Sequence, residues 1–250
     1  MSLYAVALKA AAAPTLAGAP VLTAAGKSPD EAEAFLRANP GFLGRRLPLA
    51  EARALADAAA AAGLPALIAA EAALPAFPPA VFPEKIEIAD DGFYAAAAGR
   101  RLFVPYDSVT VISAAAYEAP VEPATLSALK PGLLARITEL AGRRPPDFPA
   151  PARETRLLAD IIGGPGPLRL RLRPEDLDFL PLGRELSPSA DANFRNLLGE
   201  IAARAFRAAG SACLAAMVKG GPLGPLRYAG AEACDEALTR LLLAAGAEAE

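Results

Sequence analysis

Hydrophobic and polar positions in the first 74 residues predict a small α+β unit. Hydrophobic side chains alternate with small ones over residues 3–8, which is the pattern of a β-strand. The motif Ser28-Pro-Asp-Glu31 has the pattern of a capping box with proline in the first turn, and it predicts a helix that runs to Ala38. Further elements are expected as a strand at residues 42–47, a helix at residues 49–62 that ends at Gly63, and a strand at residues 66–70.

Three segments of this unit carry a family likeness. They read Tyr-Ala-Val-Ala-Leu-Lys from Tyr4, Gly-Lys-Ser-Pro-Asp-Glu-Ala-Glu-Ala-Phe-Leu from Gly26, and Ala-Glu-Ala-Arg-Ala-Leu-Ala from Ala50, followed by Ala-Gly-Leu-Pro-Ala-Leu-Ile from Ala62. In these residues the block 1–74 resembles the C-terminal domain of the bacterial ribosomal stalk protein L7/L12, and the resemblance implies helices packed on a three-stranded sheet. The family's factor-contacting helix would fall near residues 15–25, where this chain has no lysine or arginine. The resemblance therefore implies a fold and no factor-binding residue.

Two proline-rich runs, at residues 74–80 and 145–151, lack periodicity and are interpreted as linkers. They divide the chain into a unit at 1–74, a middle block at 80–119, a proline-rich connector at 120–151 and a last block at 152–250. In the middle block, alternating segments predict four short antiparallel strands at residues 85–89, 93–97, 102–105 and 109–113. This pattern resembles half the barrel of a small bacterial pleckstrin-homology-like (PH-like) domain.

The last block is expected to be a sheet edge followed by helices, which makes the whole chain an α+β protein. Leu168-Arg-Leu-Arg-Leu-Arg173 alternates strictly, so its leucines should lie on one face of a strand and its arginines on the other. Residues 177–182 are expected to pair with this strand. Helices are expected at residues 192–208, 212–218 and 232–244.

Composition removes several classes of chemistry. The chain has no histidine, which excludes Ser-His-Asp and Cys-His nucleophile activation and every histidine-ligated zinc or haem site. Its two cysteines, Cys213 and Cys234, cannot supply a four-thiolate zinc site and are interpreted as small buried hydrophobes, although a disulfide between them stays open. No cofactor is expected. The net charge of -3 gives no general attraction for nucleic acid or for an anionic membrane.

The hydropathy pattern points to a cytoplasmic protein. The first residues do not combine a basic region with a long apolar run, as a secretory signal would. The longest apolar stretch, residues 55–70, is mostly alanine and is interrupted by Asp57, Gly63 and Pro65, so no membrane-spanning helix is expected.

Three groups of residues are candidates for chemistry. Gly26-Lys27-Ser28 matches the end of a phosphate-binding loop, but Val21 stands where that loop needs glycine, which favours the helix cap instead. The acidic pairs could bind a hard cation or act as acid and base, although turns and helix ends use such pairs routinely. These pairs are Asp90 with Asp91, Glu175 with Asp178, and Asp235 with Glu236.

Arginines are the third group. Arg169, Arg171 and Arg173, together with Arg100 and Arg101, could form a surface for an anion or an acidic partner if the blocks bring them together. Doublets at Arg45-Arg46 and Arg143-Arg144 could add to it. The alternative is that the three arginines of the last block are solvated charges on an exposed strand face.

These observations favour a non-catalytic interaction module or an accessory subunit of a larger bacterial assembly, with a protein partner and no nucleic acid. A first alternative is a carboxylate- or metal-dependent enzyme acting on an anionic substrate, which would need two carboxylates beside the arginines in one deep pocket. A second is peripheral binding to anionic lipid, which would need a one-sided basic patch on the middle block from Lys85, Arg100 and Arg101. In composition and layout the whole chain resembles uncharacterised multi-domain proteins of alanine-rich bacteria, which implies no activity.

Overall fold

A computed structural model describes residues 2–10, 13–120, 153–164 and 166–248. It confirms the α+β class, because helices and three sheets are both present in this part of the chain. The connector expected at 120–151 lies, apart from its first residue, outside the described residues, as does the Arg143-Arg144 doublet.

The N-terminal unit is a three-stranded antiparallel sheet with the order β2-β1-β3. Its strands are β1 (Tyr4–Leu8), β2 (Phe42–Leu47) and β3 (Ala66–Ala70). Three helices pack on one face: α1 (Ala19–Ala24), α2 (Pro29–Ala38) and α3 (Leu49–Ala61). Val6, Leu8 and Leu36 lie at the centre of the core between helices and sheet, where each is at most 2% exposed.

The start of α2 confirms the capping box. The Ser28 hydroxyl accepts a hydrogen bond from the Glu31 backbone N–H at 3.2 Å, and the Glu31 carboxylate accepts one from the Ser28 N–H at 2.8 Å. Both orphan amides of the first turn are therefore satisfied within the chain. The Gly26-Lys27-Ser28 motif accordingly begins a helix.

The middle strands form a second antiparallel sheet, β5-β6-β7, with one strand fewer than the sequence predicts. Its strands are β5 (Lys85–Ile88), β6 (Gly92–Ala97) and β7 (Arg100–Pro105). The expected fourth strand is β8 (Val109–Pro120), which leaves this sheet and pairs instead with β9 (Arg153–Gly163) from Val109 to Pro120. The prediction of four strands in one sheet is therefore corrected.

The largest sheet has five strands in the order β11-β8-β9-β10-β4. Strand β10 (Leu168–Leu172) pairs with β9 on one side and with β4 (Ala80–Val81) on the other. The short β11 (Ala209–Gly210) closes the opposite edge beside β8. Residues 177–182 do not pair with β10 as expected, because β4 occupies that edge. The first residue of β4, Ala80, is the last residue of the run interpreted as a linker.

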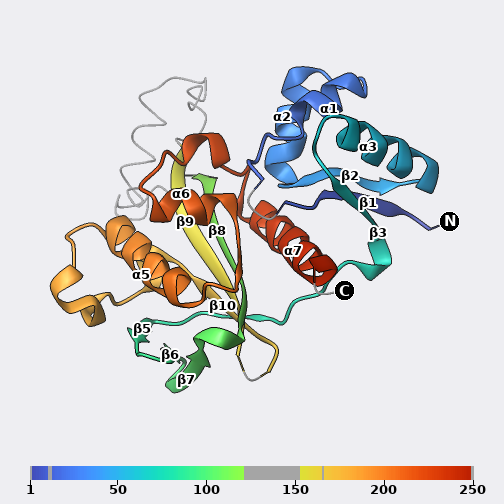
Figure 1. Cartoon of the computed structure of the whole chain (residues 1–250). Coiled ribbons are helices and arrows are strands. Elements are labelled where there is room, and N and C mark those ends of the chain that lie inside the picture. The colour runs from blue at the N-terminus through green and yellow to red at the C-terminus, as the bar shows by residue number, and fades with distance from the viewer. Residues whose placement is uncertain (1, 11–12, 121–152, 165, 249–250) are drawn as a thin grey trace, which may run out of the picture.

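Helices cover both faces of the five-stranded sheet (Figure 1). On one face lie α5 (Ala190–Arg204), α6 (Ala212–Val218) and the β5-β6-β7 sheet, and their side chains share one core with those of β8, β9 and β10. On the other face lies α7 (Ala231–Glu248). Strands of the expected middle and last blocks thus pair in one sheet and share one core, so the division at residues 119–152 does not separate two hydrophobic cores.

The short 3-10 helices are η1 (Glu71–Ala73), η2 (Tyr106–Ser108), η3 (Pro174–Asp176), η4 (Leu180–Glu185) and η5 (Gly224–Leu226).

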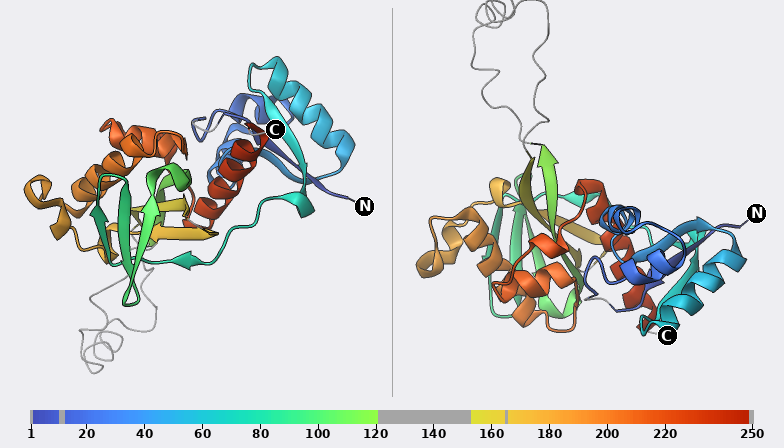
Figure 2. Two further views of the ribbon diagram at one scale, coloured as in Figure 1. Left: turned by 60° about the horizontal axis from the view of Figure 1, so that its bottom comes forward. Right: turned by 90° about the horizontal axis from the view of Figure 1, so that it is seen from above.

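Helix α7 lies between the five-stranded sheet and the N-terminal unit (Figures 1 and 2). Leu238 and Leu241 of α7 pack on Val111 of β8. Leu243 of α7 packs on the face of the N-terminal sheet opposite α1, α2 and α3, against Ala5, Ala7 and Phe42. No helix in the described ranges is both long and apolar enough to cross a membrane.

Candidate functional site

The arginine face of β10 is covered by α7. Arg169 is only 4% exposed, and the side chain of Arg171 is 11% exposed. The expectation of solvated charges on an exposed strand face is therefore wrong for these two residues. Their face of the sheet also carries Asp160 of β9, which is fully buried, and Asp235 of α7 reaches down onto it.

These four side chains form one ion-pair network, here called the Asp160 cluster. Arg171 lies directly opposite Asp160 in the β9–β10 pairing, and its Nε and Nη2 donate to the two carboxylate oxygens at 3.0 and 2.7 Å. Arg169 donates to the same two oxygens at 2.8 and 3.3 Å. Both guanidiniums also bond Asp235, so two positive charges face two negative ones.

The cluster stabilises the charged form of Arg171. Burial disfavours the charged guanidinium of Arg171, but the hydrogen bonds and charges of Asp160 and Asp235 outweigh it and raise its pKa above the usual value. The ring of Phe77, 4.2 Å from the Arg169 guanidinium carbon, covers that side chain further. The cluster contacts none of the cavities described below, and its bonding joins β9, β10 and α7.

The other arginines of the predicted anion surface lie elsewhere. Arg173 sits at the end of β10, where it pairs loosely with Asp176 at 3.9 Å and packs on Phe82. Arg100 and Arg101 are exposed on β7 of the smaller sheet. Arg101 bonds Glu87 at 2.6 Å, so none of the described ion pairs joins these arginines to the Asp160 cluster. An anion surface made of all five arginines stays a prediction.

The basic residues of the middle sheet do not stand alone. Lys85 bonds Glu87 at 2.9 Å, and the same carboxylate accepts from Arg101. The lysine hydrogen bond, followed by that of the arginine, lowers the pKa of Glu87 and keeps it ionised. The patch required for binding anionic lipid is therefore mixed in charge.

The two cysteines are buried thiols. Burial raises the pKa of Cys213 to about 12 and that of Cys234 to about 12, which disfavours the nucleophilic thiolate. Both are free, and they belong to hydrophobic clusters on opposite faces of the five-stranded sheet. Among the described residues, no group of three or more acidic or cysteine side chains could hold a metal ion.

An open groove of about 790 Å³ lies on the N-terminal unit, between the α1–α2 corner and α3. Its floor is β2, with Leu43, Gly44 and Leu47, and its walls include Leu22, Phe35 and Leu55. Ala54 and Ala58 are exposed along the α3 wall. We call this feature the N-terminal groove.

Three charged residues, Lys27, Arg45 and Glu51, line the N-terminal groove beside its apolar residues. Lys27 lies 5.6 Å from the centre of the Phe35 ring, and Glu51 begins the α3 wall. Arg45 donates to Glu71 at 2.9 Å and also bonds Glu236 of α7, so its charge is already balanced. The leucines and Phe35 of the groove therefore offer apolar contact, and Lys27, which takes part in no ion pair among the described residues, offers a positive charge.

Comparison of the chain with models of known families, with curated proteins and with solved structures finds no match. The geometry of the molecule is therefore the basis for the functional argument.

Sequence analysis predicted neither the Asp160 cluster nor the N-terminal groove. One signal for the cluster was present, because Asp160 interrupts the apolar run from Leu157 to Ile162, and an acid in such a run needs a buried partner. The groove had no comparable signal, since its leucines have the spacing of ordinary core residues.

Proposed function

We propose that this protein is a non-catalytic interaction module, or an accessory subunit of a larger bacterial assembly, that binds a partner protein in the N-terminal groove. The observation that carries the proposal is the apolar lining of an open groove on a folded unit. Recognition sites typically combine an apolar interior with a few polar groups at the rim. A cytoplasmic location belongs to the same proposal.

The ionisable groups support binding rather than proton transfer. The thiol pKa values are raised far above neutrality, and each carboxyl pKa that is shifted within the described residues, including that of Glu71 beside Arg45, is lowered. A catalytic acid or base works best when its pKa lies near the working pH, and these shifts move the groups away from it. The arginines and acids of the Asp160 cluster neutralise one another.

The groove also favours a particular partner chemistry. One wall of the groove is α3, and a short amphipathic segment could lay apolar side chains on Leu43, Leu47 and Leu55. An acidic residue at one end of that segment would meet Lys27. The likeness of residues 1–74 to the L7/L12 C-terminal domain, a domain that contacts other proteins, is compatible with this role only as an analogy.

A charge placed inside the groove tests the proposal. Ala58 and Ala60 are both exposed on α3, but only Ala58 lines the groove. The partner would first be captured from the encoding organism by a photo-reactive side chain at position 54, and its affinity then measured with purified proteins. We expect Ala58→Glu to weaken binding about tenfold or more and Ala60→Glu to leave it unchanged. Equal affinities of the two variants would contradict a partner site in this groove.

A further inference from the structure

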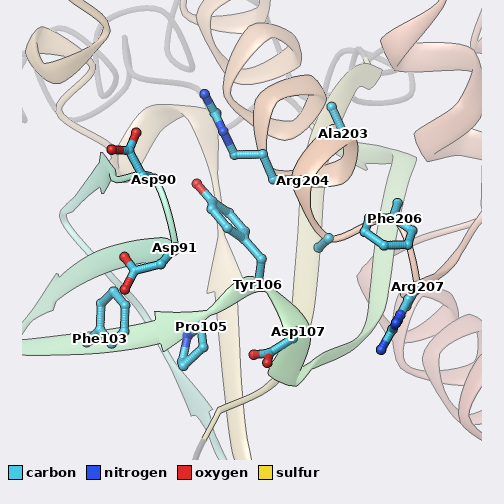
Figure 3. A pocket seen from close by; sticks show the side chains of 11 residues that line it. Asp90, Asp91, Phe103, Pro105, Tyr106, Asp107, Ala203, Arg204, Phe206 and Arg207 are labelled. Carbon is cyan, nitrogen blue, oxygen red and sulfur yellow. The ribbon is translucent and has the colours of Figure 1, made fainter.

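A second cavity, of about 800 Å³, lies outside the N-terminal unit, between the β5-β6-β7 sheet and α5 (Figure 3). It is formed where the β5–β6 turn, the β7–β8 turn and the C-terminal end of α5 meet. Asp90 and Asp91 come from the first turn, Asp107 from the second, and Arg204, Phe206 and Arg207 from the end of α5 and the residues after it. Tyr106 stands between these walls. We call this cavity the Phe206 pocket.

The acidic wall of the Phe206 pocket is held rigidly. The turn is closed by a hydrogen bond from the Ala89 N–H to the Gly92 carbonyl at 2.9 Å. The Tyr106 N–H donates to the Asp91 carbonyl at 3.2 Å, and the Tyr106 hydroxyl donates to the Ala89 carbonyl at 3.1 Å. Such preorganised walls lose little entropy when a ligand binds.

Phe206 is the feature that points to a macromolecular partner. It is 77% exposed, more than any other large hydrophobic side chain in the described part of the chain, and it stands beside a cavity rather than on a flat surface. Exposed aromatic side chains are frequent anchors of protein interfaces. Phe103 and Pro105, both partly buried, add apolar surface on the opposite side.

The charges around the pocket select the kind of partner. Within the described residues, Asp90, Asp91 and Asp107 take part in no ion pair, whereas Arg204 bonds Glu200 and is thereby neutralised. Arg207 packs 5.6 Å from the Phe206 ring centre. Three aspartates and two arginines line the pocket, and one arginine is paired with Glu200, so the balance of charge favours a basic segment over an acidic segment or a nucleic acid. The three aspartates do not form a group that could hold a metal ion.

We propose that the Phe206 pocket binds a short basic and apolar segment of a protein partner. A lysine or arginine of the segment pairs with Asp90, Asp91 or Asp107, and a neighbouring apolar side chain packs on Phe206. The site is distinct from the N-terminal groove, because the two cavities share no residue and lie on different units. A protein with both sites bridges two partner segments.

Selection of peptides tests this proposal with the full-length chain. Random dodecapeptides displayed on phage are selected against the full-length Ala58→Glu variant, in which the N-terminal groove carries an added charge, and the best binders are synthesised for titration calorimetry. We expect the selected peptides to carry a net positive charge with at least one large apolar residue, and their binding to weaken as salt rises. Selected peptides without excess positive charge, or no selected peptide at all, would overturn the proposal.

Matched variants locate the binding site. We expect Phe206→Ser and Asp91→Asn each to weaken the selected peptides about tenfold or more, since asparagine preserves a turn residue while removing its charge. Leu180→Ser changes a side chain that is 70% exposed outside the pocket and should leave affinity unchanged. Ala58→Glu in the N-terminal groove should also leave the affinity of the selected peptides unchanged. The failure of this proposal can therefore be distinguished from the failure of the proposed partner site in the N-terminal groove. Unchanged binding to Phe206→Ser and Asp91→Asn would refute the proposal.

Discussion

Asp160 balances the charges of two arginines that are buried beneath α7. It is fully buried and satisfies two guanidiniums at once, so Asp160→Asn removes the charge that balances them while keeping the side-chain shape. We expect the free energy of unfolding to fall by about 3–5 kcal/mol, because buried arginine charge is left uncompensated. Urea denaturation followed by circular dichroism measures the change.

The control for this prediction is Asp235→Asn. Asp235 bonds the same arginines, but its side chain is 43% exposed and water can replace part of its interaction. We expect a loss of about 1 kcal/mol or less. Equal losses for the two variants would show that burial does not set the strength of the cluster.

The two thiols give a second test at the level of single residues. Because burial raises the pKa of both Cys213 and Cys234 to about 12, neither forms appreciable thiolate in the folded protein near neutral pH. We expect almost no reaction with a disulfide reagent at about pH 8 in buffer, and reaction of both thiols in denaturant. A thiol that reacts at once in native protein would contradict the burial of that side chain.

At the scale of elements, the sequence predicted those features that depend on neighbouring residues alone. The Ser28 motif predicted the beginning of α2, and strict alternation predicted β10, since both depend on neighbours within a few residues. The partner of each strand was not predictable in the same way. Strand β8 pairs with β9 across the whole connector, and no pattern within residues 109–120 names that partner.

The environment of the β10 arginines shows the same limit. Alternation fixed correctly which residues share a face, but the helix that buries this face begins at Ala231, far along the chain. The N-terminal groove was equally out of reach, because it is lined by four separate elements whose apolar residues only partly cover one another. The likeness to the L7/L12 C-terminal domain stays a prediction.

At the scale of the whole molecule, α7 joins the N-terminal unit to the five-stranded sheet. One side of the helix contributes Asp235 to the Asp160 cluster, and the neighbouring Glu236 bonds Arg45 of the N-terminal unit. Arg240 donates from the same helix to the Ala10 carbonyl at 2.8 Å. Polar bonds to both units from one helix, in addition to its apolar contacts, fix their relative position.

The ion pair between Arg45 and Glu71, within the N-terminal unit, makes the stability of the protein depend on pH. The hydrogen bond from Arg45 lowers the pKa of Glu71 below its usual value of 4.5, with a smaller contribution from the Arg46 backbone N–H, although partial burial opposes the shift. When folding lowers the pKa of a carboxyl group, that group stabilises the folded protein. The full contribution is present at pH values above the pKa of the group in the unfolded chain, and it is lost as pH falls through the pKa of the group in the folded protein. We therefore expect Glu71→Gln to be less stable than the parent chain near neutral pH, and the difference to shrink below about pH 4.5. Unfolding free energies measured from about pH 3 to pH 7 test this, because the other lowered carboxyls, such as Glu118, are common to both proteins and cancel in the difference. A difference that stays constant across this range would mean that the charge of Glu71 does not contribute to the stability of the folded protein.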